Sequence, residues 1–469
     1  MTTEKRRISF VRALKFLNII LVTLPFVAYA FSRMLNITTF SEETAVSWIL
    51  VLIFVGLYKW AARTYDAFYI SYSRISELFY SQSLSILVAD GFMFLILWLL
   101  LRRIPPFLPA LLTFAIQLLV SGIWCISVQK WYFTIFPPAK AFVVWDQRKD
   151  LLDLVNSADW LKRYRVIGEC RSDSCLEDLS VLGGVETVFM SGIRSHERNI
   201  IMKYCVEHEI PAFVIPRLGD LIMSSSKKIH MFHLPILQVS RYNPSPEYLF
   251  AKRFLDIVIS LIGLVVTAPI MLVTSIAIKA YDNGPIFYKQ KRLTKDGKIF
   301  EVLKFRSMRV DAEKDGKARL SSGATDQRIT PVGRIIRGCR IDELPQLINI
   351  LKGDMSIVGP RPERPEIASE YEKTLPEFNL RLQSKCGLTG YAQVYGKYNT
   401  TPYDKLQMDL MYLSQPSLVQ DLAIMLATIK ILFMKESTEG VSEDKKVDES
   451  KVYEKREDNR KLTPMSYSK

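Results

Sequence analysis

The residues best suited to chemistry are two adjacent acids, Asp342 and Glu343. Two cations, Arg337 and Arg340, come just before them, and a rigid Pro-Arg-Pro corner follows at 360–362. Guanidinium groups close to carboxylates are typical of sites that bind phosphate groups. This concentration makes Asp342 a candidate nucleophile.

The acidic pair also lies at the start of a predicted short helix. Leu344, Leu347 and Leu351 follow at helical spacing, and Gly353 is a stop signal. Asp342 falls where an N-cap is expected, and a positive helix end would lower its pKa and favour an incoming diphosphate. An acidic pair in this position is usually only a cap, so the alternative of a purely structural role stays open on this stretch alone.

The composition indicates a membrane protein with anionic partners. The chain has 469 residues, 49% of them hydrophobic, and a formal charge of +14. Such a basic balance favours anionic lipid head groups or a nucleotide substrate, and the apolar runs make nucleic acid the weaker candidate. We expect no nucleic-acid partner.

Four apolar runs within the first 140 residues predict four membrane helices, at 17–31, 45–58, 84–101 and 107–128. Cations gather before the first run, between the second and third, and after the fourth. This bias predicts that both ends of the bundle lie in the cytoplasm. We expect no cleaved signal peptide, because no small-residue cleavage site follows the first run.

Two further features of the chain bear on function. Asp90 lies inside the third run, where a carboxylate could mark a transport path or simply form hydrogen bonds within the bundle. The six cysteines are scattered and are expected to be free thiols in a cytoplasmic setting. Neither feature predicts a metal site.

The middle segment alternates short β-rich runs with helical runs between 141 and 215, which predicts a small parallel α/β domain. A dinucleotide site would need a glycine-rich turn after the first strand, but that strand runs into the polar residues 146–149. We therefore interpret this domain as a cofactor-free scaffold or regulatory module.

A fifth apolar run, Ile257 to Ile278, has basic residues on both flanks and Pro269 inside it. Similar charge on both sides favours a helix that breaks at Pro269, dips into one leaflet and returns, over an ordinary fifth crossing. Ala268 precedes the proline, so no hydroxyl supports the kink.

Several motifs follow this run in a fixed order: Phe287 to Arg292, Asp296 to Phe300, Leu303 to Met308, Pro331 to Arg334, Asp342 to Gln346 and Gly359 to Pro362. Together they resemble the bacterial polyprenyl-phosphate phosphoglycosyl transferases over roughly 248–434. The larger members of that family are similar to this chain from end to end.

The resemblance implies transfer of a sugar-1-phosphate from a UDP-sugar to undecaprenyl phosphate, with release of UMP. It implies that Asp342 is the nucleophile, that Glu343 helps to hold Mg²⁺, and that Pro360 and Pro362 belong to a nucleotide-binding loop. The basic residues that it implicates in phosphate binding are Lys304, Arg306, Arg337, Arg340 and Arg361. For Arg306 and Arg340, a structural ion pair stays an equal alternative.

Three weaker points complete the resemblance. Asp409 and Tyr412 match an Asp near a Tyr in the family, without a clear role. The segment 417–435 is amphipathic and either lies on the membrane or completes the core. The sugar is expected to be glucose or galactose from the larger family members, with an N-acetylated sugar still open.

These inferences give a membrane protein with four transmembrane helices (1–136), a Rossmann-like α/β domain (137–243), a mixed α/β monotopic catalytic domain (244–436) with a re-entrant helix near 254–280, and a disordered tail (437–469). The catalytic domain is expected on the cytoplasmic face of the bacterial inner membrane, in surface polysaccharide synthesis. The sequence leaves open whether the chain forms a homo-oligomer. Two rivals are a membrane-anchored nucleotide-sugar dehydratase and a non-enzymatic scaffold in glycan export.

Overall fold

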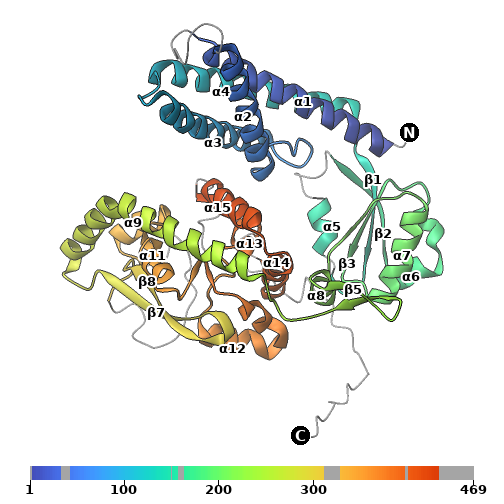
Figure 1. The fold of residues 1–469 in the computed structure, drawn as a ribbon. Coiled ribbons are helices and arrows are strands. Elements are labelled where there is room, and N and C mark those ends of the chain that lie inside the picture. The colour runs from blue at the N-terminus through green and yellow to red at the C-terminus, as the bar shows by residue number, and fades with distance from the viewer. Residues whose placement is uncertain are drawn as a thin grey trace. The chain divides into compact units, whose positions relative to one another are not determined.

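The computed structural model describes residues 3–32, 43–148, 150–156, 163–310, 328–396 and 400–432 (Figure 1). The predicted tail at 437–469 lies outside these residues. The chain divides into two compact units, with the boundary between Ile215 and Pro216. This division assigns 216–243 to the second unit, whereas our sequence-based domains place the same residues in the middle domain.

The first unit begins with four long helices, α1 (Thr3–Ala30), α2 (Glu43–Thr64), α3 (Ile75–Leu101) and α4 (Phe107–Ile135). Each is long and apolar enough to cross a membrane, as is one later helix, so the described residues contain five such helices. The length and composition of these helices fit a membrane-associated protein.

The helices pack around an interior that includes polar side chains. Phe26 and Phe54 stack with ring centroids 4.4 Å apart, next to the fully buried Tyr58. The Tyr58 hydroxyl donates to Asn18 Oδ1 at 2.6 Å, and Gln82 Nε2 donates to the Ala67 carbonyl at 2.8 Å. Polar groups among apolar helices need such partners because neither lipid nor core side chains can supply them.

A four-stranded parallel sheet follows in the same unit. Its strands are β1 (Ala139–Trp145), β2 (Tyr164–Arg171), β3 (Thr187–Ser191) and β4 (Ala212–Val214), in the order β2-β1-β3-β4. Helices α6 (Ser172–Glu177) and α7 (Ser195–Glu207) pack with one core cluster of the sheet, and α5 (Asp150–Val155) with another. The prediction of a parallel α/β domain here is confirmed.

The second unit is mixed α/β. It starts with α8 (Leu218–Ser224) and the antiparallel hairpin of β5 (Lys227–Met231) and β6 (Leu234–Gln238). After the long helix α9 come a second antiparallel pair, β7 (Phe287–Leu293) with β8 (Ile299–Phe305), and a short parallel pair, β9 (Ser356–Val358) with β10 (Gly387–Thr389). The remaining elements are η2 (Lys295–Gly297), α10 (Pro331–Gly338), η4 (Ile341–Glu343), α11 (Gln346–Lys352), α12 (Pro365–Thr374), η5 (Pro376–Gln383), α13 (Tyr391–Tyr395), α14 (Pro402–Ser414) and α15 (Leu418–Leu432).

Helix α9 (Pro246–Asp282) has two contrasting faces. The polar residues Asp256 and Ser260 are buried against the rest of the unit, whereas the large apolar side chains of Val265, Val266 and Leu272 are exposed. Among the described residues of this unit these side chains stay exposed, so the face suits a lipid environment.

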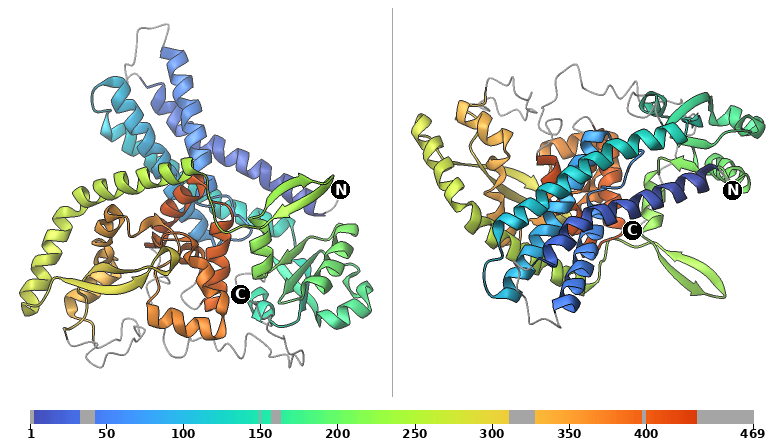
Figure 2. Two further views of the ribbon diagram at one scale, coloured as in Figure 1. Left: turned by 60° about the horizontal axis from the view of Figure 1, so that its bottom comes forward. Right: turned by 90° about the horizontal axis from the view of Figure 1, so that it is seen from above.

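Pro269 lies inside α9, and the helical assignment continues on both sides of it. Figure 2 shows the helix as one continuous, bent ribbon. The dip into one leaflet and the return therefore stay a prediction.

Candidate active site

The acidic pair lies in a 3₁₀ turn rather than at the start of an α-helix. Asp342 and Glu343 belong to η4, and α11 begins only at Gln346 with Pro345 as its N-cap residue. The expectation that Asp342 caps the helix is therefore wrong. Pro345 lacks an amide hydrogen, so it cannot donate the backbone bond to Ile341 that would continue η4 into α11 as one helix.

The turn begins from an uncommon backbone conformation. Arg340 has a φ of 57°, in the left-handed region that residues with a side chain seldom adopt. This conformation separates η4 from α10 and brings the acidic pair up against β8. At the far end of α11, Gly353 adopts a φ of 93°, which confirms the predicted stop.

Glu343 is the centre of an ionic cluster within the described part of the unit. Its Oε1 lies 2.9 Å from Lys304 Nζ and 3.6 Å from an Arg361 guanidinium nitrogen, while its Oε2 lies 3.8 Å from Arg340. The Glu343 side chain is 15% exposed. The structure thus brings together four of the predicted site residues, contributed by β8, the turn before η4, η4 itself and the 360–362 corner.

The two acids have opposite pKa shifts. Burial, reinforced by the neighbouring Glu343 charge, raises the pKa of Asp342 to about 6. Burial alone would also raise the pKa of Glu343, but Lys304, Arg361 and Arg340 outweigh it and hold that pKa well below its usual range. The expected lowering of the Asp342 pKa by a helix end is therefore wrong, because η4 is not the end of an α-helix and the carboxyl group is buried.

Three sets of buried or partly buried polar contacts fasten these elements together. Asn349 of α11 accepts the Leu303 amide of β8 at 2.9 Å and donates to the Glu301 carbonyl at 2.8 Å, directly beside Lys304. Arg253 of α9 donates to the Ile350 and Leu351 carbonyls at the end of α11. These contacts fix the strand that carries Lys304 and the helix that follows the acidic pair.

A third contact ties α9 to the strand before the Pro-Arg-Pro corner. Asp256 accepts the Ile357 amide of β9 at 2.9 Å and the Ser356 hydroxyl at 3.1 Å. Gly359 then packs so closely that a Cβ there would lie 2.4 Å from the Lys385 carbonyl oxygen. The backbone leading to Pro360 is therefore tightly packed on both sides.

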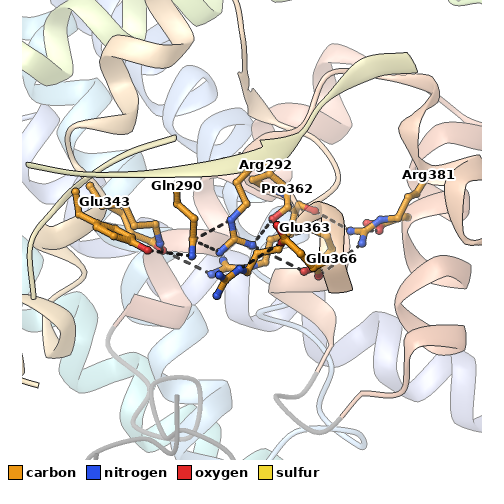
Figure 3. Close-up of polar contacts among 12 residues, drawn as sticks. Gln290, Arg292, Glu343, Pro362, Glu363, Glu366 and Arg381 are labelled. Atoms are coloured by element: carbon orange, nitrogen blue, oxygen red, sulfur yellow. Dashed lines mark hydrogen bonds and ion pairs between the residues drawn. The ribbon is translucent and has the colours of Figure 1, made fainter. Parts of the chain in front are cut away.

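Two arginines hold the backbone of the corner itself. Arg381 donates to the Arg361 carbonyl, and Arg292 donates to the Pro362 carbonyl, each at 3.0 Å. Figure 3 shows Arg292 and Arg381 approaching Glu363 from opposite sides. The predicted loop residues Pro360 and Pro362 thus lie in a segment whose carbonyl groups accept hydrogen bonds. The Arg361 side chain of the same segment approaches Glu343.

The remaining predicted cations have different surroundings. Arg306 is buried and pairs with Asp282 at the end of α9, and a Cβ on Gly284 would collide with its guanidinium. The structural ion pair that we considered for Arg306 is thus present. Arg337, at the end of α10, is close enough for its charge to oppose the rise in the Asp342 pKa.

Asp409 and Tyr412 both lie on α14 but belong to separate networks. Asp409 pairs with Arg381 at 2.7 Å, and burial raises its pKa to about 6. Tyr412 donates to Asp421 at 2.7 Å, and Asp421 is also paired with Lys252. Within the described part of the chain, the hydrogen bonds and ion pairs of Asp409 and Tyr412 do not reach the acidic pair, so any effect on that pair passes through other residues.

Asp421 lies on α15, which covers most of the predicted amphipathic segment. Ile424 and Ala427 of this helix are buried, and Thr428 bonds to Thr389 of β10. Val419 on the opposite face is 70% exposed. This helix therefore completes the core of the unit with one face and leaves an apolar face outside.

Sequence reasoning missed Arg292, Asn349, Glu363 and Arg381. Arg292 lies inside a quoted motif and Glu363 directly follows another, and the charge of each was a signal that we did not use. Asn349 sits among the apolar residues of α11, and a polar residue on a predicted buried face is itself a signal. Arg381 has no local signal, because its role depends on contacts with residues 18 and more positions away.

The site does not coincide with the large cavity of this unit. That cavity has a volume of about 1370 Å³ and is lined by residues that include Leu221, Asp296 and Leu382. None of the predicted site residues lines it. The acidic pair lies instead next to Lys304, Arg340 and Arg361.

The carboxylates of the site are the side chains that could hold Mg²⁺. No group of three or more His, Cys, Asp or Glu side chains in the described residues is arranged to hold a metal. Mg²⁺, however, is commonly held by one or two carboxylates together with substrate phosphates and water. The adjacent Asp342 and Glu343 fit that second pattern.

Comparison with known proteins supplies a family. Residues 247–435 match the sequence profile of the family described as "Bacterial sugar transferase". This range contains α9, the acidic pair, the corner and both arginines that hold it.

Three relatives illustrate the similarity. The chain is 35% identical over 231 residues to the UDP-N-acetylgalactosamine-undecaprenyl-phosphate N-acetylgalactosaminephosphotransferase of Aeromonas hydrophila, covering 49% of this chain and 53% of that protein. It is 44% identical over 160 residues to a putative undecaprenyl-phosphate N-acetylgalactosaminyl 1-phosphate transferase of Bacillus subtilis, covering 34% and 84%. It is 39% identical over 186 residues to the UDP-glucose:undecaprenyl-phosphate glucose-1-phosphate transferase of Caulobacter vibrioides, covering 39% and 69%. The match thus spans about half of the longer Aeromonas relative and most of the two others.

Proposed function

Because this chain belongs to the bacterial sugar transferase family, we propose that it transfers a sugar-1-phosphate from a UDP-sugar to undecaprenyl phosphate and releases UMP. The observation that carries the proposal is the buried acidic pair, with Asp342 beside a Glu343 carboxylate surrounded by Lys304, Arg340 and Arg361. Asp342 is a candidate nucleophile, and the three cations are of the kind that a diphosphate substrate needs.

The proposed reaction has two displacements at one phosphorus atom. An Asp342 carboxylate oxygen attacks the sugar-linked phosphorus of the UDP-sugar, and the bond from that phosphorus to the bridging oxygen of UMP breaks. A phosphate oxygen of undecaprenyl phosphate then attacks the same phosphorus and displaces the carboxylate. The products are UMP and a lipid-linked diphosphosugar, and Asp342 is regenerated.

The pKa values support this division of roles between the acids. With a pKa of about 6, Asp342 is mainly ionised at neutral pH yet remains more basic than an ordinary aspartate, which favours attack on phosphorus. Glu343 has a strongly lowered pKa and stays ionised throughout. Lys304, Arg340 and Arg361 are held near it and can stabilise charge that develops on phosphoryl oxygens.

Mg²⁺ is proposed as the cofactor, held by Glu343 with help from Asp342. When bound it would offset negative charge on the diphosphate and on the departing UMP. The protein's own residues keep the Glu343 carboxylate oriented, because Lys304 donates to its Oε1 at 2.9 Å.

The membrane-facing features of the chain suit a lipid acceptor. The phosphate of undecaprenyl phosphate lies at the membrane surface, and its tail lies in the lipid. Helix α9 exposes Val265, Val266 and Leu272 on one face and is fastened to the site through Arg253 and Asp256 on the other. We propose that α9 is re-entrant and that the site stands on the cytoplasmic face, where UDP-sugars are present.

The choice of sugar is left to experiment. We propose a hexose, with glucose or galactose first. The relatives' names include N-acetylgalactosamine in Aeromonas and glucose in Caulobacter, so an N-acetylated sugar belongs in the same panel.

The test is an assay of the purified full chain with undecaprenyl phosphate, Mg²⁺ and a panel of UDP-hexoses. The expected product is UMP with one or two of the sugars, together with a labelled phosphosugar adduct on the protein that Asp342→Asn abolishes. Release of UDP would contradict the phosphoglycosyl route. An adduct that persists in Asp342→Asn would contradict the assignment of the nucleophile.

A further inference from the structure

The backbone of the 360–362 corner is held at successive carbonyl groups by guanidinium groups from distant segments. Arg381 of η5 donates to the Arg361 carbonyl, and Arg292 of β7 donates to the Pro362 carbonyl, both at 3.0 Å. The Leu293 amide adds a third bond, to the Glu363 carbonyl at 3.0 Å. Three consecutive carbonyl groups are therefore fixed.

One carboxylate links the two arginines. Glu363 Oε1 lies 3.7 Å from Arg381, and its Oε2 lies 3.9 Å from Arg292. Arg292 also donates to Gln290 Oε1 at 2.6 and 3.1 Å, which fixes the plane of its guanidinium (Figure 3). A planar, multiply bonded guanidinium holds one orientation, which a lysine could not reproduce.

The arrangement is buried and anchored from behind. The Arg381 side chain is 3% exposed, and Asp409 of α14, at 2.7 Å, is 2% exposed. Burial in this cationic surrounding, which includes Arg361, lowers the pKa of Arg292 to about 10. Buried ion pairs of this kind often specify a geometry more than they add to stability.

From this geometry we propose that Arg292, Glu363, Arg381 and Asp409 form a corner clamp, a set of positioning residues that holds Arg361 against Glu343. The Arg361 side chain is 41% exposed and lies 3.6 Å from Glu343. A long, half-exposed side chain loses conformational entropy when it is held in one place, so a fixed backbone beneath it lowers that cost. The inference rests on the proposed function, in which Arg361 stabilises phosphoryl charge.

The activity test is a double-mutant cycle on UMP release. Glu363→Gln keeps the size of the side chain and removes the charge that both arginines share. If the clamp acts through Arg361, Glu363→Gln lowers kcat about tenfold in the natural protein but less than about twofold in an Arg361→Ala background. Equal losses in both backgrounds would overturn the proposal. Asp409→Asn is expected to behave in the same way.

The control is Lys289→Gln. Lys289 lies on the same strand as Arg292 but pairs with Glu301 at the surface and is 62% exposed. It is expected to leave kcat and KM unchanged. Thermal unfolding of every variant separates a loss of positioning from a loss of fold, and Arg292→Lys replaces Glu363→Gln if the latter does not fold.

A second measurement needs no substrate and so separates this inference from the proposed function. Hydrogen exchange of peptides covering 359–364 is expected to accelerate at least about tenfold in Glu363→Gln and to stay unchanged in Lys289→Gln. Unchanged exchange in both Glu363→Gln and Arg381→Lys would overturn the clamp even if activity fell. A natural protein that releases no UMP would refute the proposed function, while the exchange result would still decide on the clamp.

Discussion

The acidic pair shows how neighbouring carboxyl groups acquire different properties. Asp342 is buried beside the charged Glu343, so its pKa rises to about 6. Glu343 lies close to several cations, and its pKa is lowered. Adjacent groups whose pKa values are driven apart are typical of sites in which each group has its own task. Here the more basic carboxylate suits attack, and the permanently charged one suits the binding of cations.

Asp342→Asn should make the protein more stable while abolishing the adduct. The folded-state pKa of about 6 exceeds the ordinary 3.8, so the folded state binds the proton more tightly and loses stability as pH rises between these values. At pH 7, without metal, the carboxylate costs about 1–3 kcal/mol, which the amide removes. Thermal unfolding in a chelating buffer should show the gain at pH 7 and a smaller one at pH 4.

Glu301→Gln is the control for this comparison, because Glu301 is an exposed carboxylate of the same unit. It should change stability little at either pH. An Asp342→Asn protein that unfolds more readily than the natural one at pH 7 would contradict the assigned pKa shift.

Lys304→Met should have the opposite effect. It removes the 2.9 Å partner of a buried carboxylate whose folded-state pKa is lowered, so it removes stability that is present above about pH 4.5 and fades in acid. We expect a loss of about 1–3 kcal/mol at pH 7, a smaller loss at pH 4, and at least about 100-fold slower UMP release. Urea unfolding at the two pH values checks the sign, and a larger loss in acid would refute it.

At the scale of elements, the site is an assembly of short segments held by polar contacts. The turn η4 is only three residues long and cannot position two carboxylates by itself. Its position depends on β8, α11 and α9. Asn349 joins α11 to β8, and Arg253 joins α9 to α11. A few polar side chains therefore fix the short turn η4 relative to the longer elements around it.

Asn349→Leu tests this dependence. The change leaves the Leu303 amide and the Glu301 carbonyl without their side-chain partner, which should cost about 1–3 kcal/mol and lower kcat through a displaced Lys304. Lys352→Gln, an exposed change on the same helix, is the control and should be neutral. Differential scanning calorimetry and the UMP assay would measure both, and full activity in Asn349→Leu would argue against the coupling.

At the scale of the whole molecule, a basic chain carries five helices that are apolar enough for a membrane. Four of them fall within the first 135 residues, and the fifth, α9, belongs to the unit that holds the acidic pair. Whether α9 crosses or returns determines on which side the pair works. Because the bundle of the first four helices is predicted to end in the cytoplasm, a cytoplasmic site requires that α9 return to the same side. The basic residues at both ends of α9 favour this topology.

The topology can be measured with reporter fusions. A reporter enzyme that is active only outside the cytoplasm should be inactive after residue 435 if α9 is re-entrant. The same reporter after residue 104, between the third and fourth helices, should be active and serves as the control. Strong activity at 435 would show that α9 crosses the membrane.

The sequence by itself determined the features that depend on local pattern. Apolar length predicted the four N-terminal helices, strand and helix periods predicted the parallel α/β domain, and ordered motifs marked Asp342, Glu343, Lys304 and Arg361. Hydropathy, period and motif order are properties of adjacent residues, so no tertiary contact is needed to read them.

Only the tertiary structure decided the properties that depend on burial and on distant partners. It placed Asp342 in a buried 3₁₀ turn and so raised a pKa that a helix cap would have lowered. It also joined Arg292 and Arg381 around Glu363, across almost ninety positions of the chain. A pKa and an ion pair are set by the charges and the solvent within a few ångströms, and those neighbours exist only once the chain has folded.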